Sequence, residues 1–156
     1  MKERNRPSIE VVNEIVLNVF KLNGYFLKAA DCLTKDSELT SARWQVLGTV
    51  LHEQHPVAAI ARSMGLARQS VQRIADILVA EGLAEYLPNP AHRRAKLLSS
   101  TDRGLNSIKK IRPKVVAWAG RVNDLIGEDE INDAERVIAS LLTKLITHED
   151  QLIKRC

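Results

Sequence analysis

Two short apolar patterns follow one another in the middle of the chain. Each has the i, i+3, i+4, i+7 spacing of one helical face, and Gly65 lies between them. Glycine is favoured just after the C-terminus of a helix, so Gly65 predicts a tight turn. The apolar positions are Val57, Ile60, Ala61 and Met64 in the first pattern and Val71, Ile74, Ala75 and Leu78 in the second. The pair is typical of a helix-turn-helix, in which apolar side chains lock two short helices together.

The opposite face of the second helix carries polar side chains. In a helix-turn-helix, the N-terminal residues of the second helix reach base edges in the DNA major groove. Arginine can pair with guanine, glutamine with adenine, and serine can reach a base or a phosphate. This face therefore predicts DNA binding, and a solvated surface helix is the alternative. The candidates are Arg68, Gln69, Ser70, Gln72 and Arg73.

After Gly82 the sequence pattern changes from the spacing of a helix to that of short strands. Residues 84–87 and 95–99 have the pattern of short strands, and the turn-rich segment 88–94 separates them. This predicts a β-hairpin beside the second helix. A loop of this kind can enter the minor groove with its cations, whereas the alternative is an exposed basic turn. The candidate DNA-binding residues of the hairpin are Arg93, Arg94 and Lys96.

Positive charge is concentrated in the same part of the chain. Residues 57–123 contain twelve basic and four acidic side chains, whereas residues 124–156 contain four basic and eight acidic ones. Residues 1–56 are balanced, with seven of each sign. A basic centre between neutral and acidic ends predicts that the centre meets a polyanion.

Helical patterns precede the centre. Residues 8–33 are apolar over most of the helical circumference, so this helix needs partners on more than one side. A second helix is expected to begin at Thr40 or Ser41. It should end near His55–Pro56, because the residue before a proline is disfavoured in the α region.

Two long helical patterns complete the chain. The first can be capped by Thr101, and Gly127 separates it from the last helix, whose apolar stripe extends to Leu152. Pro113 lies inside the first of these patterns. It is expected to kink or break that helix, because proline lacks the backbone N–H group.

From residue 39 to residue 104 these features have a specific order and spacing. These features include the stretches LTSARWQVL (39–47), IARSMGLARQSVQR (60–73) and NPAHRRAKLL (89–98), which leads into TDRG (101–104). With these stretches the segment resembles the MarR (multiple antibiotic resistance regulator) family of winged helix-turn-helix transcriptional regulators, and the flanking helices agree with that family's layout.

The resemblance implies a mainly α fold with a small β-hairpin wing. Residues 39–104 would form the winged helix-turn-helix, and residues 1–38 and 105–156 a helical dimerisation region. The expected function is that of a transcriptional repressor, which binds a palindromic operator in double-stranded DNA as a homodimer. Half-sites about one helical turn apart are expected.

The resemblance further implies release from DNA by a small aromatic or phenolic effector. Such a ligand would bind between the dimerisation helices and the winged module. The candidate lining residues, each of which could equally belong to the core or the surface, are Tyr25, Phe26, Arg43, Trp44 and His52.

Two positions depart from the family's usual pattern. Ala67 stands where many members start the second helix with Ser or Thr, and it lacks an N-capping side chain. His92 stands where the wing commonly has an Asp that steadies the arginine two residues later. The orientation of Arg94 is therefore not fixed by that pairing.

Other classes of function have weaker support. Cys32 could be a redox-sensing thiol, although it is expected to be buried and inert, because reactivity needs an accessible, electropositive site. A winged helix used only for protein contacts would need an apolar or acidic outer face. No enzyme motif, metal-ligand spacing or cofactor signature is present. The chain shows no signal peptide and no apolar stretch of membrane-spanning length, so a cytoplasmic protein is expected.

Overall fold

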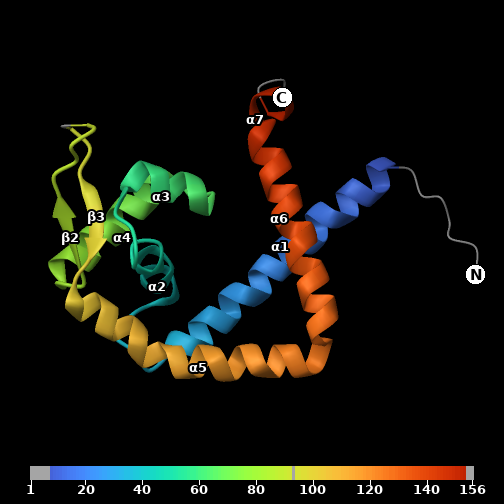
Figure 1. Ribbon diagram of the computed structural model, residues 1–156, viewed down its shortest axis with the longest axis horizontal. Coiled ribbons are helices and arrows are strands. Elements are labelled where there is room, and N and C mark those ends of the chain that lie inside the picture. The colour runs from blue at the N-terminus through green and yellow to red at the C-terminus, as the bar shows by residue number, and fades with distance from the viewer. Residues whose placement is uncertain (1–7, 93, 154–156) are drawn as a thin grey trace, which may run out of the picture. The chain divides into compact units, whose positions relative to one another are not determined.

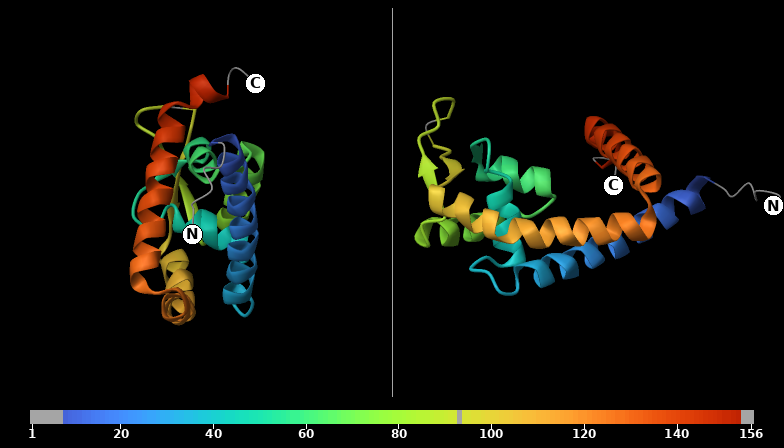
Figure 2. Two further views of the ribbon diagram at one scale, coloured as in Figure 1. Left: turned by 90° about the vertical axis from the view of Figure 1, so that its right-hand side faces the viewer. Right: turned by 60° about the horizontal axis from the view of Figure 1, so that its bottom comes forward.

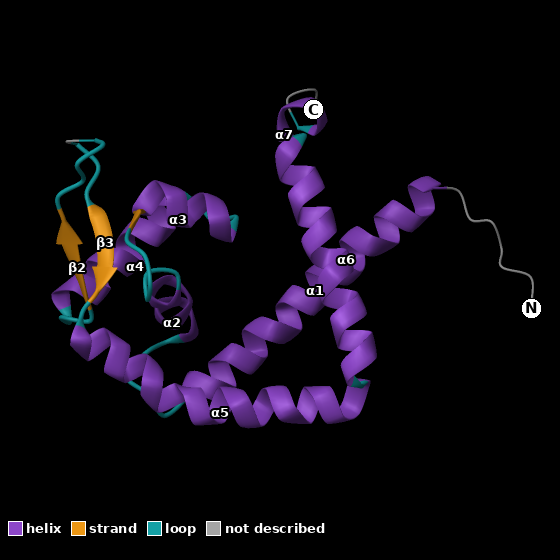
Figure 3. Cartoon of the chain, viewed as in Figure 1, coloured by secondary structure: helices purple, strands orange, loops and turns teal. Residues whose placement is uncertain are grey.

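The computed structural model describes residues 8–92 and 94–153 and is mainly helical, with one small antiparallel sheet (Figures 1 and 3). The expected fold class is confirmed. Residues 1–112 and 113–156 form two compact units, each with its own internal contacts. The expected DNA contact at Arg93 lies outside the described residues.

The helix-turn-helix consists of α3 (Val57–Met64) and α4 (Arg68–Ala80), as the sequence predicts. Gly65 adopts a left-handed conformation with φ of 63°, which favours glycine. The N–H group of the following Leu66 donates to the carbonyl of Ala61 at 2.9 Å and closes the end of α3. The side chains that lock the two helices are buried: Val57, Ile60 and Ala61 from α3, and Val71, Ala75 and Leu78 from α4.

Three strands form the sheet in the order β1-β3-β2, all antiparallel: β1 (His55–Pro56), β2 (Ala84–Leu87) and β3 (Leu97–Ser100). Strands β2 and β3 are the predicted hairpin, which extends past α3 and α4 (Figure 2). Strand β1 was not predicted, because two residues are too short to show an alternating pattern. It pairs with β3 through His55 and Leu98.

Helix α2 (Ser41–Gly48) begins as expected, since Thr40 Oγ1 accepts a hydrogen bond from the N–H group of Arg43 at 3.3 Å. The expectation that it continues to His55–Pro56 is wrong. The N–H group of Val50 bonds to the carbonyl of Leu47 in a tight turn, and the chain then becomes extended to pair with β3. Helix α2 therefore ends at Gly48, seven residues before β1 begins.

Helix α5 (Asp102–Ile126) contains Pro113 and continues through it, so the expected break is absent. Proline removes the hydrogen bond to the carbonyl four residues earlier. Here that carbonyl belongs to Lys109, and both residues are exposed, so water can satisfy the freed group. The start of α5 is capped by Thr101, whose Oγ1 accepts from the N–H group of Gly104 at 3.2 Å.

The C-terminal unit ends in α6 (Glu128–Thr147) and the short α7 (Glu149–Leu152). The sequence pattern predicted one helix here, but His148 separates two. Gly127 precedes α6 with φ of 98°, another conformation that suits glycine. None of the described helices is both long and apolar enough to cross a lipid bilayer.

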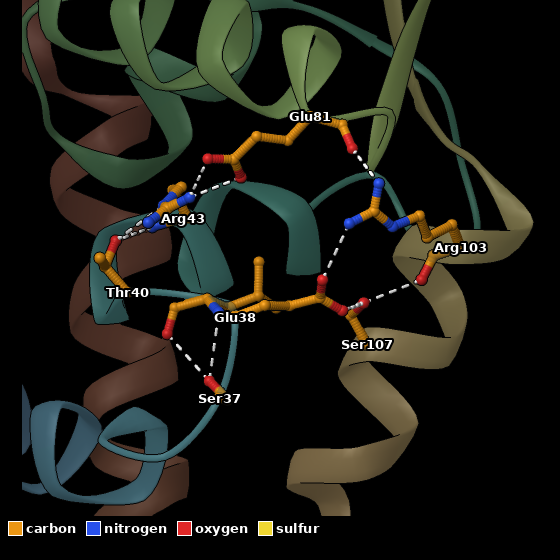
Figure 4. Close-up of polar contacts among 8 residues, drawn as sticks. Ser37, Glu38, Thr40, Arg43, Glu81, Arg103 and Ser107 are labelled. Atoms are coloured by element: carbon orange, nitrogen blue, oxygen red, sulfur yellow. Dashed lines mark hydrogen bonds and ion pairs between the residues drawn. The ribbon is translucent and has the colours of Figure 1, made fainter.

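A polar network joins the loop before α2 to α4 and to the start of α5 (Figure 4). Arg43 contacts both carboxylate oxygens of Glu81 through Nη1, at 2.6 and 2.5 Å. Arg103 donates to the carbonyl oxygen of Glu81 at 2.6 Å and to the Glu38 carboxylate at 3.1 Å. The hydroxyl of Ser107 also donates to Glu38, and these bonds hold the pKa of the Glu38 carboxyl below its usual value. The network fixes the C-terminal end of α4 against its neighbours.

Candidate nucleic-acid interface

Helix α4 turns one face to the core and exposes the other. Val71, Ala75 and Leu78 are completely buried, which fixes the rotation of the helix about its axis. The first-turn residues and Arg73 are exposed, as the sequence predicts. Ala67 is the N-cap residue and makes no side-chain capping bond, so the expected lack of a cap is confirmed. The exposed candidates on this helix are Arg68, Gln69, Ser70 and Arg73.

Gln72 is half-buried, unlike these neighbours, because it is bonded to the wing. Its amide nitrogen donates to the hydroxyl of Tyr86 on β2 at 2.7 Å and to Oδ1 of Asp76 at 2.9 Å. The Tyr86 hydroxyl donates to the same Asp76 oxygen at 2.7 Å. We call these three residues the Gln72–Asp76–Tyr86 triangle. It connects the middle of α4 to the first strand of the hairpin.

Tyr86 is a site residue that the sequence reasoning missed. The i, i+4 pair of Gln72 and Asp76 was readable as a helical contact, but no local signal brings β2 to it. Burial, together with the nearby Asp76 carboxylate, raises the pKa of Tyr86 to about 12. The hydroxyl therefore stays protonated at neutral pH and remains a donor. The ammonium group of Lys96 lies 5.9 Å from the centre of the Tyr86 ring.

A cleft of about 260 Å³ separates α4 from the wing. The N-terminal end of α3 closes one side of it, through Pro56, Val57 and Ala58. Three cationic side chains line the cleft, Arg68 from α4 and Arg94 and Lys96 from the wing, and no acidic residue is among the lining residues. Residues from two separate candidate segments of the sequence thus meet in one place. We call this feature the basic cleft.

Sequence comparison places this architecture in a family. A sequence model for the MarR family matches residues 37–95. An uncharacterised protein of Mycobacterium tuberculosis is 34% identical over 115 residues, which cover 74% of this chain and 80% of the relative. The chain belongs to the MarR family. An uncharacterised protein of Mycobacterium bovis matches to the same extent.

Solved structures of MarR-family proteins share the fold. A MarR-family transcriptional regulator from Rhodococcus sp. RHA1 superposes with a TM-score of 0.72 at 21% identity, covering 83% of this chain and 94% of the other. CouR from Rhodococcus jostii RHA1, solved with bound p-coumaroyl-CoA, gives 0.71 at 23% identity, covering 83% and 92%. The regulator BldR from Sulfolobus solfataricus gives 0.75 at 15% identity, covering 89% and 99%. This MarR-family chain therefore has a transcriptional-regulator fold.

The wing of this MarR-family protein leaves Arg94 unrestrained by an acid. Both His92 and Arg94 are exposed, and among the described residues Arg94 has no ion-pair partner. The guanidinium group can turn toward a phosphate without first breaking an ion pair.

The five candidate effector residues have different surroundings. Tyr25 and Phe26 are exposed on α1 (Ser8–Thr34), and His52 is exposed after α2. Trp44 is half-buried, and Arg43 is held by Glu81. None of the five lines the basic cleft. A larger depression of about 760 Å³ lies at the start of α5 and is also lined by other residues, which are Glu38, Arg103, Asn106, Ser107, Lys109 and Lys110.

Cys32 is exposed near the C-terminal end of α1, so the expectation of a buried thiol is wrong for the single chain. The helix turns Leu33 inward instead, and the neighbouring Cys32 then points away from the core. Within residues 8–92 and 94–153, no group of three or more potential metal ligands lies close enough to hold an ion.

Proposed function

We propose that this MarR-family protein is a sequence-specific DNA-binding repressor. Helix α4 lies in the major groove in this proposal, and the wing contacts the adjacent minor groove and its phosphates. The basic cleft carries the proposal, because the cationic side chains of Arg68, Arg94 and Lys96 all line it. Such a cluster suits the phosphate backbone, and the exposed Gln69 and Arg73 suit base edges.

We further propose that the protein acts as a homodimer on a palindromic operator. Helix α1 exposes a large apolar surface in the single chain; Ile9 is 76% and Phe20 69% exposed. Soluble monomers rarely leave so much contiguous apolar surface in water. A second copy would cover α1 and would hold two copies of α4 at a fixed distance. In this arrangement residues 1–38 and 105–156 form the dimerisation region, and residues 39–104 the DNA-binding domain.

Regulation by a small aromatic or phenolic anion completes the proposal. The structural relative CouR was solved with p-coumaroyl-CoA, an aromatic acyl thioester. A ligand of this type weakens DNA binding if it prefers the conformation that does not fit the operator. The candidates remain Tyr25, Phe26, Arg43, Trp44 and His52. Ligand contact at Arg43 would compete with its ion pair to Glu81. The proposed site of action is the cytoplasm.

The proposal is tested by selection of bound duplexes from a random DNA pool with the purified full-length protein. We expect enrichment of a palindrome whose half-sites are about one helical turn apart. Binding to the selected duplex should weaken steeply with rising salt, because each phosphate contact releases counterions. A pool that shows no enrichment, with affinity independent of salt, would contradict the proposal.

A module that binds only proteins is the competing candidate. It predicts an apolar or acidic outer face on α4. Over residues 68–75, the N-terminal part of α4 that would enter the groove, the exposed side chains are Arg68, Gln69, Ser70 and Arg73, which donate hydrogen bonds and include two cations. The composition of this face therefore favours DNA.

A further inference from the structure

We propose that Tyr86 and Asp76 determine which bases Gln72 accepts. In the Gln72–Asp76–Tyr86 triangle both amide hydrogens of Gln72 are in use, so only its oxygen can face DNA. A glutamine restricted in this way selects a base that carries an exocyclic amino group, adenine or cytosine. This inference rests on the proposed function, since it assumes that α4 lies in the major groove.

The direction of each hydrogen bond in the triangle follows from Asp76. An ionised carboxylate can only accept, and Oδ1 of Asp76 contacts both the Gln72 nitrogen at 2.9 Å and the Tyr86 oxygen at 2.7 Å. The single proton of the Tyr86 hydroxyl is therefore directed at Asp76. The Tyr86 oxygen is left as an acceptor, and it takes the second amide hydrogen of Gln72 at 2.7 Å.

The same carboxylate prevents the amide from turning over. A flipped Gln72 would place its carbonyl oxygen against Oδ1 of Asp76 and against the Tyr86 oxygen, whose proton already points at Asp76. Two acceptors would then face each other without a proton between them, which is unfavourable. The raised pKa of Tyr86 supports this arrangement, because the phenol keeps its proton far above neutral pH. Gln72 therefore has one amide orientation.

This orientation limits what Gln72 can read. The usual pairing of glutamine with adenine needs one N–H donor for N7 and one carbonyl acceptor for the N6 amino group. Here no amide hydrogen remains for N7. Within the described part of the chain, the Gln72 carbonyl oxygen has no hydrogen-bond partner and can accept from N6 of adenine or N4 of cytosine. Guanine O6 and thymine O4 are acceptors at the equivalent places and would be disfavoured.

Gln72 lies where such a contact can be made. It lines the basic cleft together with Arg68, which is one helical turn earlier on the same face of α4, and with Arg94 of the wing. A phosphate held by these arginines would bring the adjacent base pairs toward α4. Tyr86 and Asp76 act only through Gln72 in this scheme, so both are positioning residues.

The test is selection from a random duplex pool with the full-length protein and four variants. Gln72→Ala identifies the base position that Gln72 reads, because the preference at that position disappears. At this position the wild type should accept adenine and cytosine at similar frequencies and disfavour guanine and thymine. Tyr86→Phe removes one acceptor and frees one amide hydrogen for adenine N7. The ratio of adenine to cytosine should then rise about fivefold or more.

Asp76→Asn provides an independent variant that keeps the tyrosine. Its side-chain amide can donate as well as accept, so the amide group of Gln72 can flip. The discrimination against guanine and thymine at this position should then weaken severalfold. Ser63→Ala is the matched control for loss of a hydroxyl group. Ser63 lies on α3, where its hydroxyl bonds to the carbonyl of Ile60 at 2.9 Å, and its removal should leave all base preferences unchanged.

The outcomes separate this inference from the proposed function. If the wild type enriches no sequence, the proposed function fails. If the wild type enriches a palindrome but selects adenine alone at the Gln72 position, the inference fails and the proposed function stands. The inference also fails if both Tyr86→Phe and Asp76→Asn give the wild-type profile while remaining folded by circular dichroism.

Discussion

The hydroxyl of Tyr86 lies 2.7 Å from the side-chain nitrogen of Gln72, so a hydrogen bond joins β2 to the middle of α4. The two proposed DNA-contacting elements, helix and wing, are therefore connected directly as well as through the short chain segment between them. This connection keeps Arg68 of α4 near Arg94 and Lys96 of the wing. DNA contacts by the helix and by the wing can then form without a change in the relative position of the two elements.

Removal of one wing cation is expected to weaken DNA binding. Arg94→Ala occurs in both copies of the dimer, so the affinity for a selected duplex should fall about a hundredfold, tenfold for each charged hydrogen bond lost. The slope of log affinity against log salt should fall by about 1.8, because one phosphate contact is lost in each half-site. The control is Arg136→Ala on α6, which removes an equal charge that is paired with Asp133 at 2.7 Å. Equal affinities for Arg94→Ala and the wild type would show that the wing is not part of the DNA interface.

Arg73 is expected to contribute to binding and not to folding. Its side chain is exposed on α4, opposite the buried Val71 and Ala75. Arg73→Ala should lower specific affinity about tenfold or more and change the free energy of unfolding by less than about 0.5 kcal/mol. Fluorescence anisotropy and urea titration measure the two effects. Comparable losses in both would make Arg73 a structural residue.

A charge in the apolar face of α1 is expected to separate the dimer. Phe20 is 69% exposed in the single chain, so Phe20→Glu removes few contacts from the fold itself. In a symmetric dimer the substitution occurs twice, at about 2 kcal/mol each, and should raise the dimer dissociation constant roughly a thousandfold. Sedimentation equilibrium measures this change. Lys28→Glu, an exposed polar position on the same helix, is the control, and an unchanged dimer in Phe20→Glu would exclude this face as the interface.

Gly104 is expected to tolerate no side chain. A Cβ atom built there would lie 2.0 Å from the carbonyl oxygen of Leu83, and backbone cannot yield as a side-chain end can. Gly104→Ala should destabilise the fold by about 3 kcal/mol or prevent folding. Gly48→Ala, at the end of α2 with no atom within 4 Å of its Cβ, should cost less than about 0.5 kcal/mol. Similar urea midpoints for both variants would disprove the close approach.

The stability that Tyr86 contributes to the fold is expected to be lost at high pH. Its pKa is raised from 10.0 to about 12, so the folded state favours the protonated phenol. The contribution is fully present below pH 10 and is lost as the pH rises to about 12. The measurement is the difference in free energy of unfolding between the wild type and Tyr86→Phe across this range. A difference that does not change with pH would show that the phenol lacks this environment.

Local patterns in the sequence were sufficient to predict most of the winged helix. The bounds of α3, the left-handed Gly65 and the inward side chains of α4 all follow from apolar spacing and one glycine. Strand β1 was not predicted, because its pairing with Leu98 is long-range and involves only two residues. The end of α2 at Gly48 was also missed, because the expected end was read from Pro56 alone.

The candidate site was predictable only in part. Arg68, Arg94 and Lys96 were identified by residue type, but their meeting in one cleft depends on how the hairpin packs against α4. The half-buried state of Gln72 and the role of Tyr86 depend on the same packing. The exposure of Cys32 depends on the rotation of α1, which its nearly uniform apolar pattern did not define.

The close approach of Gly104 to Leu83 also determines how movement can spread through this unit. Because backbone touches backbone there, the first turn of α5 cannot slide past the segment that follows α4. Arg103 adds a second attachment, at the carbonyl oxygen of Glu81. A displacement of this end of α5 must therefore carry the C-terminal end of α4 with it. The start of α5 is thus coupled rigidly to α4, the helix that is proposed to read bases.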